Sequence, residues 1–170
     1  MTDTHLRDNV SKLAKTNIKD AYGLTEKIVQ PWFKAQALSH ITRYSNSGDV
    51  VKLAKEARAV AYECDDDYKK ASVRAWEIVA LAECGFKKEA KKSLDEAVNL
   101  ASGIEPLSSR AESLFILFQA SCYINMKVAK KLYERMESLC PIEGHWRAKR
   151  AMKNADDILD DKTIVREFFW

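Results

Sequence analysis

Residues 71–98 decide the fold class, and they read ASVRAWEIVALAECGFKKEAKKSLDEAV. In 73–81 the apolar residues form a broad stripe beside Arg74 and Glu77, and in 90–100 they recur at steps of three and four. This spacing follows the 3.6-residue turn of an α-helix. Gly85 lies between the two segments, where a glycine is typical of a helix stop. The stretch therefore predicts a hairpin of two helices joined by a short turn.

Similar helical patterns continue in both directions along the chain. Helix stop and start signals divide it at 30–31, 47–49, 64–67, 102–106 and 140–144. No stretch alternates polar and apolar residues for long enough to predict a strand, and five glycines and three prolines are too few for a turn-rich β fold. We therefore expect an all-α protein. The predicted helices cover residues 5–29 (continuous, or broken near Thr16 or Gly23), 31–46, 49–63, 67–84, 87–101, 106–124, 127–139 and 144–159.

The predicted hairpins repeat with a period of 36–37 residues. Ala37-Leu38 and three Arg-Ala pairs, beginning at Arg74, Arg110 and Arg147, occupy the same place near the start of four helices. One hairpin cannot bury its apolar face alone, whereas stacked hairpins can. We expect a single domain that consists of an N-terminal capping helix (1–30), hairpin repeats at 31–66, 67–104 and 105–142, a C-terminal capping helix (143–160) and an aromatic tail (161–170).

The segment GFKKEAKKSLDEA, residues 85–97, resembles the turn and second helix of a tetratricopeptide repeat. Gly85 matches the turn, Ala90 the small residue where the two helices cross, and Leu94 and Ala97 the later packing positions. The first helix is more similar to the degenerate prokaryotic version, and the period exceeds the usual length of about 34 residues. The resemblance covers about 31–155. It implies a right-handed α-α superhelix, a TPR-like solenoid of about seven to eight helices in antiparallel hairpins.

The same resemblance implies where a partner would bind. In the tetratricopeptide family, the first helices of the hairpins line a concave groove. Transferred from the Gly85 repeat, this pattern puts one row of groove residues at Thr42, Val79, Phe115 and Met152, and a second row at Asn46, Glu83, Gln119 and Asp156. The alternative is that these side chains pack between repeats. An error of one residue would turn each position by about 100° around its helix.

Two further features suggest binding. Arg74, Arg110 and Arg147 recur at the repeat period and would form either a basic rail for an acidic peptide or phosphate, or bridges to carboxylates of neighbouring hairpins. The tail ends in the aromatic residues Phe168, Phe169 and Trp170, and an exposed patch of this kind is unusual on a soluble monomer. The tail is therefore expected to fold back onto the last repeat, or to dock into a partner or into the groove of a second copy as a homo-oligomer.

Composition narrows the function classes. The 28 basic and 25 acidic residues give a net charge of +3, too balanced for a nucleic-acid partner. The four cysteines have no zinc-site spacing and are predicted to be buried free thiols of a cytoplasmic protein. The first twelve residues lack the apolar region of a secretory signal, and no apolar run is long enough to span a membrane. The three histidines show no metal spacing.

We therefore expect a cytoplasmic protein–protein interaction module that binds a peptide or helix of a partner, without catalysis, metal or cofactor. The alternative is a small helical enzyme or a nucleic-acid-processing factor whose site the sequence does not reveal. Such a protein would need a pocket that gathers His, Asp, Glu or Cys from several helices, or a continuous basic face.

Overall fold

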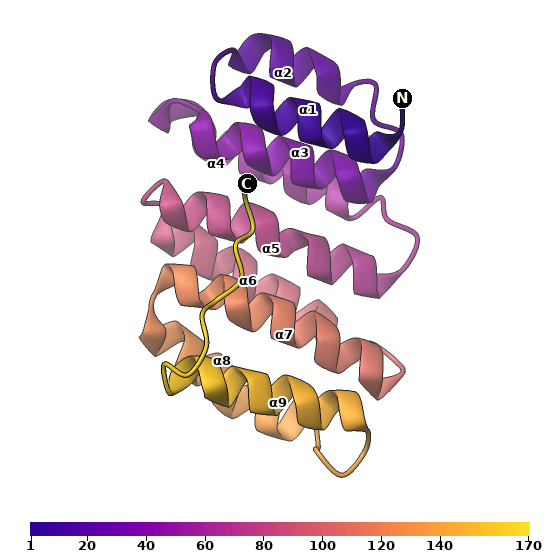
Figure 1. Ribbon diagram of the computed structural model, residues 1–170, viewed down its shortest axis with the longest axis vertical. Helices are drawn as coiled ribbons and strands as arrows, with labels where there is room; N and C mark the ends of the chain where they lie inside the picture. Colours follow the sequence, from indigo (N-terminus) through magenta and orange to yellow (C-terminus); the bar gives the residue numbers. More distant parts are fainter.

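The computed structural model describes residues 1–170, and all of its regular structure is helical (Figure 1). The prediction of an all-α protein is confirmed. No helix combines the length and the apolar character that crossing a lipid bilayer requires. The nine helices are α1 (Asp3–Ala14), α2 (Ile18–Thr25), α3 (Pro31–Tyr44), α4 (Ser47–Ala61), α5 (Asp67–Glu83), α6 (Lys87–Ala101), α7 (Leu107–Ile124), α8 (Met126–Leu139) and α9 (Trp146–Leu159).

The helices form two rows. The odd-numbered helices α1, α3, α5, α7 and α9 pack against one another in that order, and the helices α2, α4, α6 and α8 each pack against the odd-numbered helix before them. Figure 1 shows the rows stacked along the long axis of the molecule. We call the surface that α1, α3, α5 and α7 form on the side away from α4, α6 and α8 the odd-helix face.

The turn between α5 and α6 shows why the central hairpin closes where the sequence predicts. Gly85 has a φ of 87°, a conformation that strains any residue with a Cβ atom. Its N–H donates to the carbonyl of Ala82 at 3.1 Å, and the N–H of Phe86 donates to the carbonyl of Leu81 at 2.9 Å. These two bonds satisfy carbonyls that the end of α5 leaves free. The glycine therefore ends α5 and starts the return of the chain.

The N-terminal region consists of two helices rather than the single capping helix expected over residues 5–29. The side chain of Asn17 accepts a hydrogen bond from the backbone N–H of Asp20 at 3.1 Å and so caps α2. The break lies near Thr16, one of the two places considered, whereas Gly23 lies inside α2. The chain consequently has nine helices instead of seven to eight.

The hydrophobic core extends beyond the helices into the tail (residues 161–170). The main apolar cluster runs from α3 to α9 and includes Phe168 and Phe169, while a smaller cluster joins α1, α2 and α3 around Val10, Ala21 and Ile41. Burial of one phenylalanine side chain contributes about 1.5–3 kcal/mol. The tail is therefore an integral part of this conformation.

The path of the tail differs from the simple fold-back onto the last repeat. After α9 ends at Leu159, the chain turns and crosses the odd-helix face from α7 over α5 toward α3 and α1 (Figure 1). Ser11 of α1 donates a hydrogen bond to the carbonyl oxygen of Trp170 at 3.3 Å, which joins the two ends of the described chain. The tail thus follows the row of odd-numbered helices almost from end to end.

Candidate functional site

The odd-helix face holds the main chain of the tail at Arg166. The N–H of Arg166 donates to Oε1 of Gln119 at 3.2 Å, and the hydroxyl of Tyr123 donates to the carbonyl of Arg166 at 2.8 Å. Gln119 and Tyr123 are four residues apart on α7, so both side chains extend from the same side of that helix. Almost every residue type offers an N–H and a C=O group. This clamp can therefore hold extended chains of many sequences.

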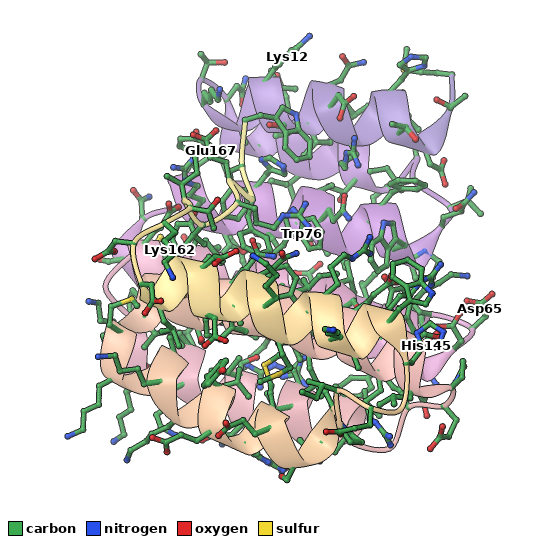
Figure 2. The ribbon with its side chains drawn as sticks, turned by 60° about the horizontal axis from the view of Figure 1, so that its bottom comes forward. Lys12, Asp65, Trp76, His145, Lys162 and Glu167 are labelled. Atoms are coloured by element: carbon green, nitrogen blue, oxygen red, sulfur yellow. The ribbon has the colours of Figure 1, made fainter.

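Next to the clamp, the face receives an aromatic ring from the tail. The ring of Phe168 meets Trp76 of α5 edge to face, with centroids 5.3 Å apart, and Tyr123 at 5.9 Å. The guanidinium of Arg166 lies over the Trp76 ring at 5.3 Å. Figure 2 shows Trp76 within the row of odd-numbered helices, with Glu167 on the tail beyond it. Edge-to-face and cation–π pairs of this kind contribute about 0.5–1.5 kcal/mol each.

The last two aromatic residues surround His40 of α3. The rings of Phe169 and Trp170 each lie 4.8 Å from the His40 ring, both edge to face. Two arginines of the helices cover these rings: Arg43 lies over Phe169 at 5.1 Å, and Arg7 lies over Trp170 at 4.8 Å. Arginines of the face therefore lie over aromatic rings of the tail, and Trp76 of the face lies under Arg166 of the tail.

Polar groups beneath the tail have no hydrogen-bond partner. Both ring nitrogens of His40 and the Nε1 of Trp76 are buried and unpaired. Burial, followed by the positive charges of Arg7 and Arg43, lowers the pKa of His40 to about 3, so the ring is neutral near pH 7. A buried polar group without a partner costs about 1–3 kcal/mol. The tail thus covers these groups without satisfying them.

The predicted groove residues divide into two groups. Thr42, Val79 and Met152 are buried in the core, and the Thr42 hydroxyl donates to the carbonyl of Leu38 at 2.8 Å. Because all three side chains are buried, these positions do not form an exposed row. Phe115 is half-buried and stacks on the buried Phe118, with centroids 6.3 Å apart.

The second predicted row is closer to the tail. Gln119 forms part of the main-chain clamp. Glu83 forms an ion pair with Arg43 at 2.5 Å, and Arg43 covers the ring of Phe169. Asn46 is exposed at the residue before α4. The structure therefore brings Gln119 to the tail directly and Glu83 through Arg43.

The three arginines of the repeat do not form a rail. Arg74 is fully buried, Arg110 pairs with Glu105 at 3.3 Å, and Arg147 pairs with Glu112 of α7 at 3.4 Å. Since the Arg74 guanidinium has no exposed surface, a continuous basic strip through these positions cannot receive a ligand. Of the three arginines, only Arg147 pairs with a carboxylate of a neighbouring hairpin.

Arg74 belongs to a buried charged network between α4, α5 and α6. Its guanidinium donates to the Tyr62 hydroxyl at 3.0 Å and to Glu96 at 3.1 Å. Arg58 contacts both Glu77 and Glu96 at 3.3 Å, and the Ser93 hydroxyl donates to Glu77. Burial raises the pKa of Glu77, against the opposing effect of Arg58 and Arg74. The network joins two adjacent hairpins, with Arg74 and Glu77 buried at its centre and Glu96 and Tyr62 partly exposed at its edge.

Two cysteine thiols and two histidines have identifiable surroundings in the fold. Burial raises the pKa of Cys122 and of Cys140 to about 11, so both thiols stay protonated near pH 7 and are weak nucleophiles. His5 contacts Thr2 at 3.0 Å as part of the cap of α1, and His145 caps α9. No three His, Cys, Asp or Glu side chains lie close enough together to hold a metal ion. No such arrangement therefore favours the enzyme alternative.

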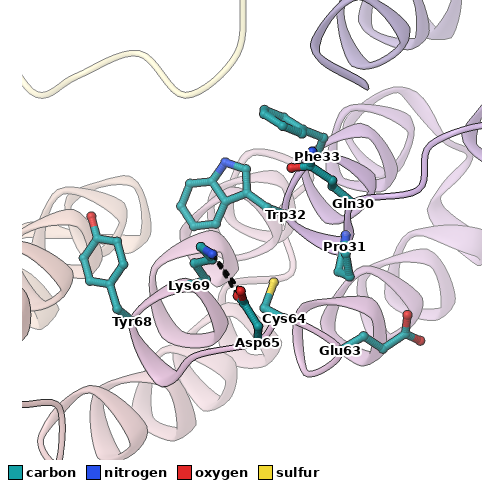
Figure 3. Close-up of a pocket in the computed structure, with 9 residues that line it drawn as sticks. All are labelled: Gln30, Pro31, Trp32, Phe33, Glu63, Cys64, Asp65, Tyr68 and Lys69. Carbon is teal, nitrogen blue, oxygen red and sulfur yellow. Dashed lines mark hydrogen bonds and ion pairs between the residues drawn. The ribbon is translucent and has the colours of Figure 1, made fainter. Parts of the chain in front are cut away.

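A cavity of about 530 Å³ lies where the start of α3 meets the connection between α4 and α5 (Figure 3). Trp32, Phe33 and Tyr68 contribute its aromatic lining, and an ion pair between Lys69 and Asp65 at 2.8 Å spans part of it. None of the unpaired buried side-chain atoms belongs to this lining. Trp32 also contacts Trp76 at 5.9 Å between centroids, so one indole joins the cavity wall to the residues beneath the tail.

Sequence reasoning missed His40, Trp76 and Tyr123 as site residues. Their signal is the combination of aromatic residues on the first helices with an aromatic tail, but the partners are far apart in sequence: 43 residues separate Tyr123 from Arg166. No protein-family model, curated protein or solved structure matches the chain. The contacts between the tail and the odd-helix face therefore carry the functional argument.

Proposed function

We propose that this protein is a non-catalytic interaction module, whose odd-helix face binds an extended segment of a partner protein. The clamp that Gln119 and Tyr123 form on the main chain of Arg166 is the observation that carries the proposal. A surface that holds one extended segment through its main chain, and reads its side chains with aromatic rings, is suited to hold another.

Several features support a tetratricopeptide-like, right-handed solenoid as the scaffold. The hairpins follow one another in sequence and in space, Gly85 closes the central turn, and Ala90 is fully buried where α5 and α6 pack. A stack of hairpins exposes one continuous surface along its first helices, which suits extended ligands. Four free cysteines support a reducing, cytoplasmic location.

The test is direct binding to a variant without the tail. A variant that ends at Lys162 would be titrated with a fluorescently labelled peptide of residues 162–170, KTIVREFFW, and its anisotropy recorded. We expect saturable binding of one peptide per chain. A peptide with serine in place of Phe168 and Phe169 is the matched control, since it keeps the main chain but loses both buried rings.

The protein side needs its own controls. Circular dichroism would establish that the variant remains helical, and Gln119→Ala with Tyr123→Phe would remove both main-chain bonds from the clamp while keeping most of the packing. We expect this pair of changes to weaken binding by about tenfold or more, because two hydrogen bonds contribute about 1–3 kcal/mol together. A folded variant that does not bind the peptide would refute the proposed function.

A further inference from the structure

We infer that the tail is an internal competitor for the odd-helix face, and that the external ligand of this face shares the tail's chemistry: an extended protein segment with a basic residue, one residue of any type, and then three aromatic residues. This inference depends on the proposed function, because it assigns the ligand and the regulation of the same surface. Three features of the contact between the tail and the helices carry it.

The first feature is that each residue from Arg166 to Phe168 has a different environment on the odd-helix face. Arg166 is bound at its main chain and stacks on Trp76. Glu167 contributes no side-chain hydrogen bond and is exposed, so the contacts place no requirement on the side chain at this position. Phe168 is 1% exposed beside Trp76. The sequence pattern that follows from these contacts begins with a cation and continues, after one free position, with an aromatic ring.

The second feature is the pair of arginines that receives the remaining rings. Arg43 covers Phe169 and Arg7 covers Trp170. Both arginines are held in place by other side chains, Arg43 by Glu83 and Arg7 by Asp8. Both guanidinium groups therefore have a partner on the helices as well as a ring of the tail. Aromatic residues at these two positions of a ligand are favoured over aliphatic ones, which have no ring to stack on.

The third feature is that the tail fits this surface incompletely. Its binding leaves the Nε1 of Trp76 and both nitrogens of His40 buried without partners. Trp170 remains 49% exposed, and residues 161–164 are exposed along the way from α9. A ligand with the same aromatic spacing and a carbonyl, amide or carboxylate oxygen that accepts from Trp76 would pair the Nε1 atom that the tail leaves without a partner. The tail therefore covers the odd-helix face, but a ligand that pairs these groups can displace it.

The test compares peptide binding to the intact chain and to the variant that ends at Lys162. The labelled KTIVREFFW peptide competes with a tethered copy of itself in the intact chain, and a short tether gives an effective concentration on the order of millimolar. Only the fraction of molecules with a released tail binds the peptide. We expect the intact chain to bind at least about tenfold more weakly than the variant.

A second variant guards against misfolding of the shortened chain. Phe168→Ser with Phe169→Ser in the full chain keeps every helix residue and weakens the tail alone, so it is expected to bind the peptide almost as tightly as the shortened chain. A peptide with glutamate in place of Arg166 is expected to lose at least about tenfold in affinity, because the cation over Trp76 is replaced by an anion.

Hydrogen exchange of the unaltered chain gives an independent readout. With saturating KTIVREFFW peptide, the backbone amide of Arg166, which donates to Gln119, is expected to lose protection while the amides of α7 keep theirs. Unchanged protection in the tail at saturation would overturn the inference. So would equal affinity of the intact and shortened chains, although the proposed function would then stand. If no folded variant bound the peptide, both would fail.

Discussion

Three arginines that look equivalent in the sequence have unequal roles in the structure. Arg74, Arg110 and Arg147 occupy the same place in successive hairpins. Arg74 is enclosed by α4, α5 and α6, whereas the Arg147 side chain is 41% exposed in its pair with Glu112. Removal of a charged side chain costs most free energy when it leaves the partner charge buried and unpaired. Periodicity therefore predicted the positions of these arginines, but their surroundings decide their effect.

Removal of Arg74 is predicted to destabilise the protein strongly. Arg74→Met leaves the buried Glu77 with Arg58 as its remaining cation. Loss of one partner from a buried ion pair costs about 3–5 kcal/mol. Because Arg58 still pairs with Glu77, the free energy of unfolding, measured by urea titration and circular dichroism, should fall by up to that amount. Arg147→Met is the matched control and should change it by at most about 1 kcal/mol. Similar losses in the two variants would contradict a special role for the buried network.

The low pKa of His40 leads us to expect that the tail loses protection from hydrogen exchange at acid pH. Arg7, Lys15 and Asp8 from the first helix region and Arg43 from α3 are the charged groups that act on this ring; the positive charges lower its pKa and Asp8 raises it. With the tail bound, the pKa is about 3, against an ordinary value of 6.5. Release of the tail uncovers the ring, and the released form then binds a proton more readily. The bound form is therefore fully favoured above pH 6.5 and loses stability as the pH falls from 6.5 toward 3.

The size of this pH effect follows from the same two pKa values. At pH 5 the loss is at most about 2 kcal/mol, since each pH unit below the higher pKa contributes about 1.4 kcal/mol, and Arg7 and Arg43 stay beside the ring and hold its pKa below 6.5 after the tail is released. Hydrogen exchange of the Arg166 amide, corrected for the intrinsic pH dependence of exchange, should show weaker protection at pH 5 than at pH 7.5. In His40→Gln the protection should vary much less with pH. An unchanged pH profile in that variant would show that other groups control the tail.

At the scale of single elements, two glycines make opposite predictions. Gly85 ends α5 with a φ of 87°, so a Cβ atom is strained there whatever the space around it. Gly23 lies inside α2, and an added Cβ would meet nothing within 4 Å. Gly85→Ala should destabilise the protein by about 1–2 kcal/mol, and Gly23→Ala should stabilise it by about 0.4–1 kcal/mol. Thermal unfolding of both variants tests this, and a shift of the same sign in the two would contradict it.

The elements were predictable because their causes are local. The apolar spacing around Trp76 and Leu94 and the glycine at position 85 all act within a few residues, so the helices after residue 30 were placed to within about two residues of their observed ends. The break before α2 depends on the cap formed by Asn17, a signal that the apolar pattern alone does not contain. The sequence offers a break near Thr16 or at Gly23, and the Asn17 cap places the start of α2 next to Thr16.

The candidate site was less predictable, because its contacts are not local. Analogy with one repeat predicts Thr42 and Val79 as groove residues, and both side chains are buried. Gln119 lies at the tail because of its position on α7. Its hydrogen-bond partner, Arg166, is 47 residues away in the sequence. No periodic pattern links an irregular segment to the surface it covers. The tail's route over four helices could therefore not be read from spacing.

For the whole molecule, the tail links helices that otherwise communicate only through their neighbours. In a stack of hairpins each unit contacts the next, and stability is approximately a sum of local terms. Here Ser11 of α1, His40 of α3, Trp76 of α5 and Tyr123 of α7 all contact one segment. Release of the tail is consequently expected to loosen α1 and α3 together, rather than one hairpin alone.

The same arrangement predicts the oligomeric state. Phe168 and Phe169, two of the three tail residues that would join copies in a homo-oligomer, are buried within their own chain. Two copies could exchange tails and keep the same contacts, but exchange competes with a tethered tail at an effective concentration on the order of millimolar. At micromolar concentration the intact chain should therefore be a monomer by sedimentation velocity. The variant that ends at Lys162 exposes Trp76 and His40, so any association should appear in that variant. A dimer of the intact chain that disappears when the tail is removed would show instead that Phe168, Phe169 and Trp170 join two copies.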